Sequence, residues 1–104
     1  MRKSLTGYSK DQIKAIHAKS RRLNALLKKN HAKALFKMLL EHGPEIKELY
    51  AKKDKHYLIE TGDLIVLCLE LIKEAKESPD TILAKCYPRF HKKIDSLIAS
   101  LGKI

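Results

Sequence analysis

The stretch EIKELYAKKDKHYLIETGD, residues 45–63, contains two acidic pairs, Glu45 with Glu48 and Glu60 with Asp63, each at positions i and i+3. On a helix, side chains at this spacing share one face, with their Cβ atoms about 5–6 Å apart. The polar run at residues 52–55 separates the two pairs and indicates a connector. The stretch therefore predicts two helices joined by a short turn, each of which carries a pair of carboxylates.

The length and composition are those of one small globular domain. The chain has 104 residues, of which 44% are hydrophobic and 33% charged, and this is an ordinary globular composition. Four Gly and three Pro leave little material for loops. We expect a single helical domain over residues 1–104, in which residues 1–8 form a disordered basic N-terminus.

The first half of the chain shows helical apolar spacing with two break signals. Ser9–Gln12 has the pattern of a capping box, and the helix that it opens is expected to run to about Lys29, with a break at Asn30. The next helix is expected to end near His42, because Gly43-Pro44 follows. A kinked helix that continues through this dipeptide is the alternative.

The second half of the chain also shows helical apolar spacing interrupted by break signals. After a helix in residues 45–51, the strongest helix is expected over residues 56–76. Ser78-Pro79-Asp80 has the residue types of a helix start, and Pro88 is expected to separate that helix from a last one over residues 90–101. Strand signals are absent. We therefore predict an all-α bundle of four or five helices.

No segment has the character of a membrane span or a secretory signal. The longest apolar run is Leu64–Leu69, whereas a bilayer needs about 20 such residues. The basic start of the chain is not followed by an apolar stretch. Cys68 and Cys86 are isolated and are expected to be reduced thiols of a cytoplasmic protein, not zinc ligands. His17, His31 and His91 carry no readable signal.

The charge is unevenly distributed along the chain. The formal net charge is +10, with a pI near 9.7. Residues 1–40 hold 11 Lys or Arg and one acid, residues 41–80 hold 6 and 10, and residues 81–104 hold 5 and one. An acidic centre between basic flanks suits a polyanion bound together with a divalent cation, and it also suits plain salt bridging between helices.

Two carboxylate pairs on facing helices would offer four oxygen donors to one cation. Such donors suit the hard cations Mg²⁺ and Mn²⁺, so the residues predict a metal site built from Glu45, Glu48, Glu60 and Asp63. His42 is a candidate ligand or general base, although a helix C-terminus also favours a cationic histidine.

The helix expected from about residue 56 has one apolar face and one acidic face. One face is an apolar arc, formed by Leu58, Thr61, Ile65, Cys68, Ile72 and Ala75. The other side is acidic, with Glu60, Asp63, Glu70, Glu74 and Glu77. An acidic face exposed to solvent explains this arrangement, but Val66 and Leu67 interrupt that face. They predict that another helix or subunit covers the segment and partly encloses Asp63.

The segment ETGDL, residues 60–64, and the acidic helix before it carry a family resemblance. They are similar to the E-x-x-E, spacer, E-x-x-D signature of the MazG-like all-α nucleoside triphosphate pyrophosphohydrolases, over about residues 35–75. Two registers fit the first half of the signature, one with Glu45 and Glu48 and the other with His42 and Glu45. Lys85 to Arg89 resemble a basic segment further along in that family.

The resemblance implies a function and a set of partners. It implies a Mg²⁺- or Mn²⁺-dependent enzyme that converts a nucleoside triphosphate to a monophosphate and pyrophosphate, assembled as a dimer or higher oligomer. Glu45, Glu48, Glu60 and Asp63 would bind metal, with His42 as the alternative first ligand. Glu48 or Glu45 would orient the attacking water, and Lys85 and Arg89 would bind phosphate.

Two other functions remain open on the sequence. A MazG-like fold that has lost catalysis would be an interaction module. A basic helical protein that binds nucleic acid would use the Lys and Arg of the first 40 residues, although these residues also fit the solvent-exposed faces of two amphipathic helices. The basic residues concerned are Arg21, Arg22, Lys28, Lys29, Lys33 and Lys37.

Overall fold

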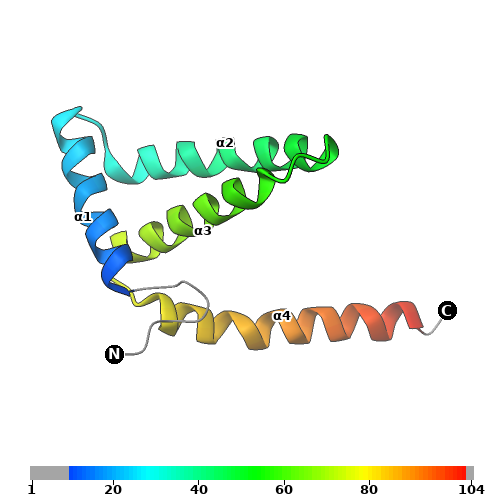
Figure 1. Cartoon of the computed structure of the whole chain (residues 1–104). Helices are drawn as coiled ribbons and strands as arrows, with labels where there is room; N and C mark the ends of the chain where they lie inside the picture. The colour runs from blue at the N-terminus through cyan, green and yellow to red at the C-terminus, as the bar shows by residue number, and fades with distance from the viewer. Residues whose placement is uncertain (1–9, 103–104) are drawn as a thin grey trace, which may run out of the picture.

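The computed structural model describes residues 10–102, and these residues form four helices and no strand (Figure 1). The helices are α1 (Lys10–Leu26), α2 (His31–Ala51), α3 (Tyr57–Glu74) and α4 (Pro79–Gly102). The all-α prediction is confirmed, and four is the lower of the two expected helix numbers. Ser9 of the predicted capping box and the N-terminal residues 1–8 lie outside the described part of the chain.

Two predicted helix boundaries are wrong. α2 continues through Gly43 and Pro44, as in the alternative interpretation, and α4 continues through Pro88. A proline inside a helix leaves the carbonyl four residues earlier without its N–H partner. These carbonyls belong to Leu40, which is 77% exposed, and to Ala84, which is also exposed. Water can therefore replace the missing hydrogen bonds, and neither proline ends its helix.

The other predicted boundaries are close to the observed ones. Asn30 is the N-cap of α2, where its side chain accepts a hydrogen bond from the Lys33 N–H at 3.0 Å. α3 follows a short connector after α2, and α4 begins at Pro79, directly after Ser78. Tyr50 and Tyr57 pack edge to face across the α2–α3 connector, with ring centroids 5.2 Å apart. This aromatic pair helps to hold the two helices as a hairpin.

The ends of α1, α2 and α3 share one unusual feature. Each helix is followed by a lysine with positive φ: Lys28 at 57°, Lys53 at 60° and Lys76 at 62°. In each case the next N–H donates to the carbonyl five residues back, as Asp54 does to Leu49 at 2.9 Å. This is the Schellman motif, which usually has glycine at the left-handed position because a Cβ is disfavoured there.

Lys53→Gly is therefore expected to stabilise the fold. The left-handed φ of 60° costs Gly nothing, and part of this gain is lost to the greater entropy of Gly in the unfolded chain. We expect the free energy of unfolding to rise by about 0.5–1 kcal/mol, measured from urea denaturation midpoints. Lys55→Gly, in the same connector but without positive φ, should give no gain. Equal effects of the two substitutions would contradict this explanation.

The core lies where α1 crosses the α2–α3 hairpin. α2 and α3 run antiparallel beside one another, and α1 crosses one end of the pair (Figure 1). The fully buried side chain at this junction is Leu35 of α2. Ile13 of α1 and both Leu67 and Leu69 of α3 are also buried. Burial of Leu67 confirms the prediction that another helix covers this part of α3.

The orientation of α3 differs from the amphipathic expectation. Its acidic side turns toward α1 and α2, so that Glu60 and Glu74 are half-buried and Glu70 is only 3% exposed. On the apolar arc, Leu58 is 57% exposed and Ile65 56%. Asp63 is exposed, so the prediction that it is enclosed is wrong. Histidines on α2 and α1 explain the inward positions of Glu60 and Glu74, because they supply partners that a purely apolar neighbour could not.

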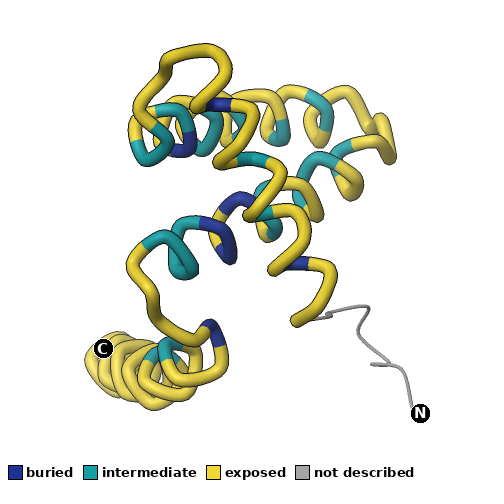
Figure 2. Tube along the Cα trace, turned by 90° about the vertical axis from the view of Figure 1, so that its left-hand side faces the viewer, coloured by how far each residue is buried: buried dark blue, intermediate teal, exposed yellow. Residues whose placement is uncertain are grey.

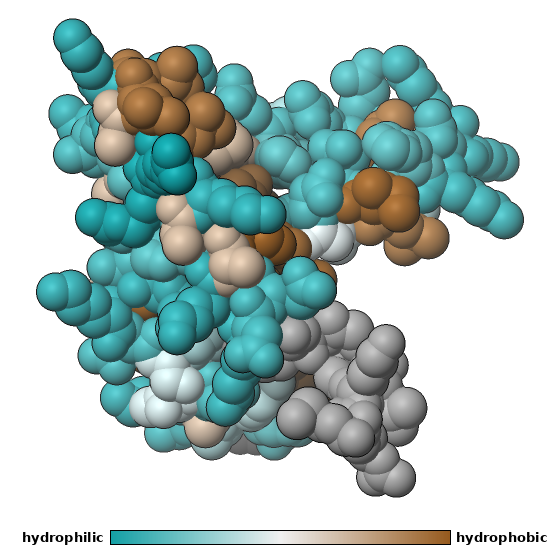
Figure 3. Space-filling model, turned by 60° about the vertical axis from the view of Figure 1, so that its left-hand side comes forward, coloured by the Kyte–Doolittle hydropathy of each residue, from teal (hydrophilic) through white to brown (hydrophobic). Residues whose placement is uncertain are grey.

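α4 projects away from the other helices. Among the described helices it packs against α3 near its own start, and Asp80 in its first turn forms an ion pair with Lys10 of α1 at 2.7 Å. Every residue from Tyr87 to Gly102 is exposed (Figure 2). Apolar patches interrupt the polar surface of the molecule (Figure 3). Within residues 10–102, no helix combines the length and the apolar character required to cross a bilayer.

Candidate metal site between α2 and α3

Glu60 is the centre of a polar cluster between α2 and α3. His42 Nε2 lies 3.4 Å from Glu60 Oε1, and His56 Nε2 lies 3.4 Å from Glu60 Oε2. His42 comes from α2, whereas His56 precedes α3 by one residue, so the cluster links the two helices. The Glu60 and His42 side chains are each 18% exposed, whereas His56 is open to solvent. His56 and Glu60 thus form an i, i+4 pair at the start of α3.

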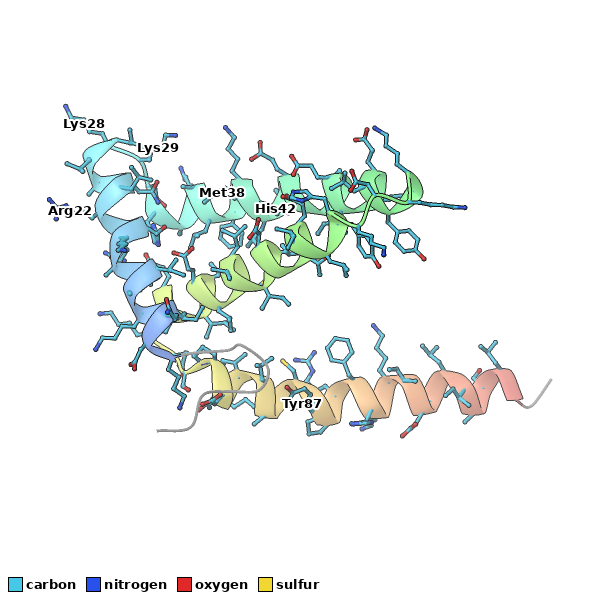
Figure 4. All side chains as sticks on the ribbon, viewed as in Figure 1. Arg22, Lys28, Lys29, Met38, His42 and Tyr87 are labelled. Atoms are coloured by element: carbon cyan, nitrogen blue, oxygen red, sulfur yellow. The ribbon has the colours of Figure 1, made fainter. Side chains whose placement is uncertain are left out.

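The orientation of His42 is fixed by its second ring nitrogen. Nδ1 lies 2.9 Å from the Met38 carbonyl oxygen, and a carbonyl only accepts hydrogen bonds, so Nδ1–H is the donor. Nε2 then faces the Glu60 carboxylate either with a second proton or with its lone pair. In the second case either a carboxyl proton or a cation lies between nitrogen and carboxylate. His42 lies on the side of α2 that faces α3 (Figure 4), and a backbone-anchored imidazole is typical of metal ligands.

Asp63 completes a group of three donors. One ligand atom each from His42, Glu60 and Asp63 lies within 4.8 Å of the other two. Asp63 follows Glu60 by one turn of α3 and is exposed, so this side of the cluster opens to solvent. A cation held here would have one nitrogen and two carboxylate ligands from the protein and would keep other coordination positions for water or phosphate.

Glu45 and Glu48 lie beside this cluster and not within it. Together with Glu60 and His56 they line a depression of about 290 Å³. Glu48 accepts a hydrogen bond from Lys52 Nζ at 2.8 Å, and this bond holds the pKa of the Glu48 carboxyl below its usual range. The structure thus brings three of the four predicted carboxylates around one depression, while His42, not Glu48, reaches the donors of α3.

The predicted phosphate ligands are distant from this cluster within one chain. Lys85 and Arg89 lie on α4, which packs against α3 and forms the Asp80–Lys10 ion pair with α1, but does not pack against α2 in the described part of the chain. Arg89 borders a small depression on α4 with Cys86, Phe90 and Lys93. Cys86 and Cys68 are both unpaired thiols, as expected from their isolated positions in the sequence.

A larger groove lies between the end of α1 and the outer side of α2. Its volume is about 470 Å³, within the range of small-molecule sites. Its lining combines apolar and basic side chains, including Leu23, Leu27, Met38, Lys33 and Lys37. Glu41, the residue directly before His42, is also part of the lining. An anionic ligand with an apolar part would fit this combination of side chains.

A second cluster, at the other end of the α2–α3 pair, was missed by sequence reasoning. His17 of α1, His31 of α2 and Glu74 of α3 each offer a donor atom within 4.8 Å of the others. Burial would raise the pKa of the Glu74 carboxyl, but hydrogen bonds from Arg21 and His17 outweigh it and hold the pKa below its usual range. The only available signal was the presence of histidines on two helices opposite an acidic helix face.

Glu74→Gln is expected to weaken the fold in a pH-dependent way. Because the pKa of Glu74 is lower in the folded state than the usual 4.5, its ionised form stabilises the fold above that pH, and the contribution is lost as the pH falls further. At pH 7 we expect the variant to lose about 1–2 kcal/mol of unfolding free energy. Urea denaturation at a series of pH values should show the difference narrowing below about 4.5.

The exposed Glu77 provides the control for this measurement. Glu77→Gln removes the same charge from the adjacent connector and should leave stability unchanged within about 0.5 kcal/mol at each pH. A Glu74→Gln deficit that stays constant down to strongly acidic pH would contradict the ionic role of Glu74.

Comparisons of the chain with protein-family models, with curated proteins and with solved structures find no match.

Proposed function

We propose that the protein is a Mg²⁺-dependent nucleoside triphosphate pyrophosphohydrolase of the MazG-like kind, with Mn²⁺ as an alternative cofactor. The observation that supports this function most directly is the meeting of His42, Glu60 and Asp63 between two antiparallel helices. The pair Glu60 and Asp63 belongs to the segment that resembles the family, and it comes from α3, while the third donor comes from α2.

The proposed chemistry assigns different tasks to the two groups of side chains. A divalent cation at this cluster would neutralise phosphate charge and lower the pKa of a bound water. Glu60 and Asp63 hold the cation, and His42 is the first ligand. Glu45 and Glu48 border the adjoining depression, where a carboxylate can orient the attacking water and accept its proton. Glu45 is the better candidate, because Glu48 is paired with Lys52.

The groove beside α1 suits the substrate of such an enzyme. Leu23, Leu27 and Met38 provide apolar surface for a base, while Lys33 and Lys37 provide positive charge for phosphates. Glu41, the neighbour of His42 in sequence, belongs to the lining of this groove. In this proposal the base lies toward α1, and the phosphates extend along α2 toward the cation.

We also propose that the protein works as a dimer in which a second copy covers α4. Apart from Ile98, the exposed large apolar residues of α4 follow the alternating spacing of four and three positions that pairs helices. They are Leu83, Tyr87, Phe90, Ile94, Leu97 and Leu101. The apolar arc of α3 has the same spacing, and four of its residues are exposed: Leu58, Ile65, Cys68 and Ala75. In a symmetric dimer the α4 of each copy would pack against both surfaces of the other.

These six residues form an apolar stripe on α4, and the predicted phosphate ligands lie outside it. Lys85 and Arg89 lie outside the heptad positions of α4. A dimer would therefore bury the apolar side of α4 while these two basic residues remain available to a polyanion. Without a partner, an exposed helix with such a stripe is marginally stable in water.

The test of the enzymatic proposal is pyrophosphate release from a panel of canonical and modified nucleoside triphosphates, with Mg²⁺ or Mn²⁺. Metal-dependent release that yields the nucleoside monophosphate supports it. Absence of release from every substrate would contradict it and would favour the interaction module.

Binding of nucleic acid is the second candidate, and the corner between α1 and α2 favours it. Arg22, Lys28 and Lys29 extend outward there, away from the Glu60 cluster (Figure 4). Binding that falls steeply with salt and needs no Mg²⁺ would support this candidate. Binding that requires the divalent cation would favour the nucleotide instead.

A further inference from the structure

We infer that His17, His31 and Glu74 form a second metal site, specific for a borderline cation such as Zn²⁺ and independent of the Glu60 cluster. One donor atom from each of these residues lies within 4.8 Å of the other two. They come from α1, α2 and α3, so the site would join all three helices of the core. Two imidazoles and one carboxylate form a ligand set that suits Zn²⁺ better than Mg²⁺.

The geometry of two donors already matches a bound metal. His17 Nε2 lies 3.2 Å from Glu74 Oε1. Two ligands at zinc bonding distance and tetrahedral angle are roughly 3.3 Å apart, so a cation fits between them without movement of the helices. The His17 and His31 rings lie 5.5 Å apart at their centroids and are tilted by 59°. A small rotation of the rings would bring the third donor to the same point.

His31 has the features of a ligand without its cation. Its Nε2 atom is inaccessible to solvent and has no hydrogen-bond partner among the described residues. Its Nδ1 contacts the buried amide of Asn24 at 2.7 Å. The atom that faces the ring is the amide nitrogen Nδ2, which donates to Nδ1 in this arrangement. A half-turn of the Asn24 amide places its oxygen there instead, so that Nδ1–H donates to Oδ1 and the Nε2 lone pair is free to bind a cation. A second hydrogen bond of this kind orients most metal-binding histidines.

The charges near the cluster also favour a cation. Glu70, one turn before Glu74 on α3, is a buried acid whose Oε1 has no hydrogen-bond partner among the described residues. A buried carboxylate without a partner is costly unless positive charge is near. Arg21 Nη1 donates to the same Glu74 oxygen as His17, but its side chain is 55% exposed and can move into solvent when a metal binds.

The test is titration of the whole protein with Zn²⁺ and, for a spectroscopic signal, with Co²⁺. Zn²⁺ at about 100 times its Kd should raise the Tm by about 10 °C. Co²⁺ should give the strong visible absorption of a tetrahedral ion with nitrogen ligands. His17→Gln and His31→Gln should each weaken Zn²⁺ binding about 100-fold or more. Mg²⁺ should not compete.

Two control variants separate this site from other histidines. His91→Gln changes an exposed residue of α4, and His42→Gln removes the histidine of the Glu60 cluster. Both variants should retain the Zn²⁺ response of the unmodified protein. Equal Zn²⁺ affinity in the unmodified protein and in His17→Gln or His31→Gln would overturn the inference, as would the absence of any Zn²⁺ response in the unmodified protein.

A measurement on the unmodified protein guards against variants that fail to fold. Zn²⁺ should shift the imidazole NMR signals of His17 and His31 and leave those of His91 unchanged. Shifts confined to other histidines would overturn the inference. This outcome does not depend on hydrolase activity, so it also separates the zinc site from the proposed function.

Discussion

Replacement of Glu60 by Gln is expected to abolish Mg²⁺-dependent pyrophosphate release, with a loss of about 1,000-fold or more in kcat/KM. Glu60 contacts both His42 and His56 and shares the donor group with Asp63. A Gln at this position keeps the size of the side chain but removes the charge that holds the cation. Asp63→Asn should have a comparable effect. Steady-state assays at saturating Mg²⁺ give the required comparison.

Glu77→Gln is the matched control for this substitution. It removes one carboxylate from an exposed position directly after α3, outside both clusters, and should leave kcat/KM within about twofold of the original value. Thermal melts with and without Mg²⁺ add a second measurement: Mg²⁺ should raise the Tm of Glu77→Gln and not that of Glu60→Gln. Full activity in Glu60→Gln would refute the proposed site.

Replacement of Leu97 by Asp should convert a dimer into a monomer. Leu97 lies in the middle of the exposed apolar stripe of α4, and twofold symmetry places the substitution in the interface twice. A buried, unpaired carboxylate in each copy should weaken the dimer at least ~100-fold. Sedimentation equilibrium or light scattering should then give the mass of one 11.9 kDa chain in place of two.

The opposite side of α4 provides the control for this experiment. Ala99→Asp introduces the same charge two residues away, outside the stripe and at an equally exposed position, and should leave the mass unchanged. If the unmodified protein is a monomer at high concentration, or if both variants dissociate alike, the proposal that a second copy covers this stripe is wrong.

The helices themselves were readable from the sequence because their signals are local. Apolar spacing, the N-cap at Asn30 and the start at Pro79 depend on residues within one or two turns. The helix ends predicted at Pro44 and Pro88 were wrong. The effect of a proline inside a helix depends on whether water reaches the carbonyl that the proline leaves without a hydrogen bond. That accessibility is a property of the folded molecule.

The orientation of α3 could not be predicted, because it depends on side chains far away in sequence. Periodicity identified an apolar face and an acidic face, and ordinary burial preferences placed the apolar face inside. The observed helix turns Glu60 and Glu74 inward, toward His42 of α2 and His17 of α1. The partners of Glu74 lie more than 50 positions away in the sequence, beyond any local pattern.

The candidate site was predictable only where its residues lie on one helix. Glu60 and Asp63 lie on one helix, so their proximity followed from their spacing. Whether His42 or Glu48 is the donor from α2 depends on how α2 is rotated about its axis relative to α3. That rotation is set only when the two helices pack together. His42 reaches Glu60, whereas Glu48 pairs with Lys52 on the surface.

The central claim is that His42, Glu60 and Asp63 bind one divalent cation between α2 and α3. Crystals soaked in Mn²⁺, examined by anomalous scattering, test it directly. We expect a single strong peak at this cluster, about 2.0–2.3 Å from carboxylate oxygens of both Glu60 and Asp63. The absence of a peak there, or Mn²⁺ bound only at exposed acids such as Asp95 of α4, would contradict the claim.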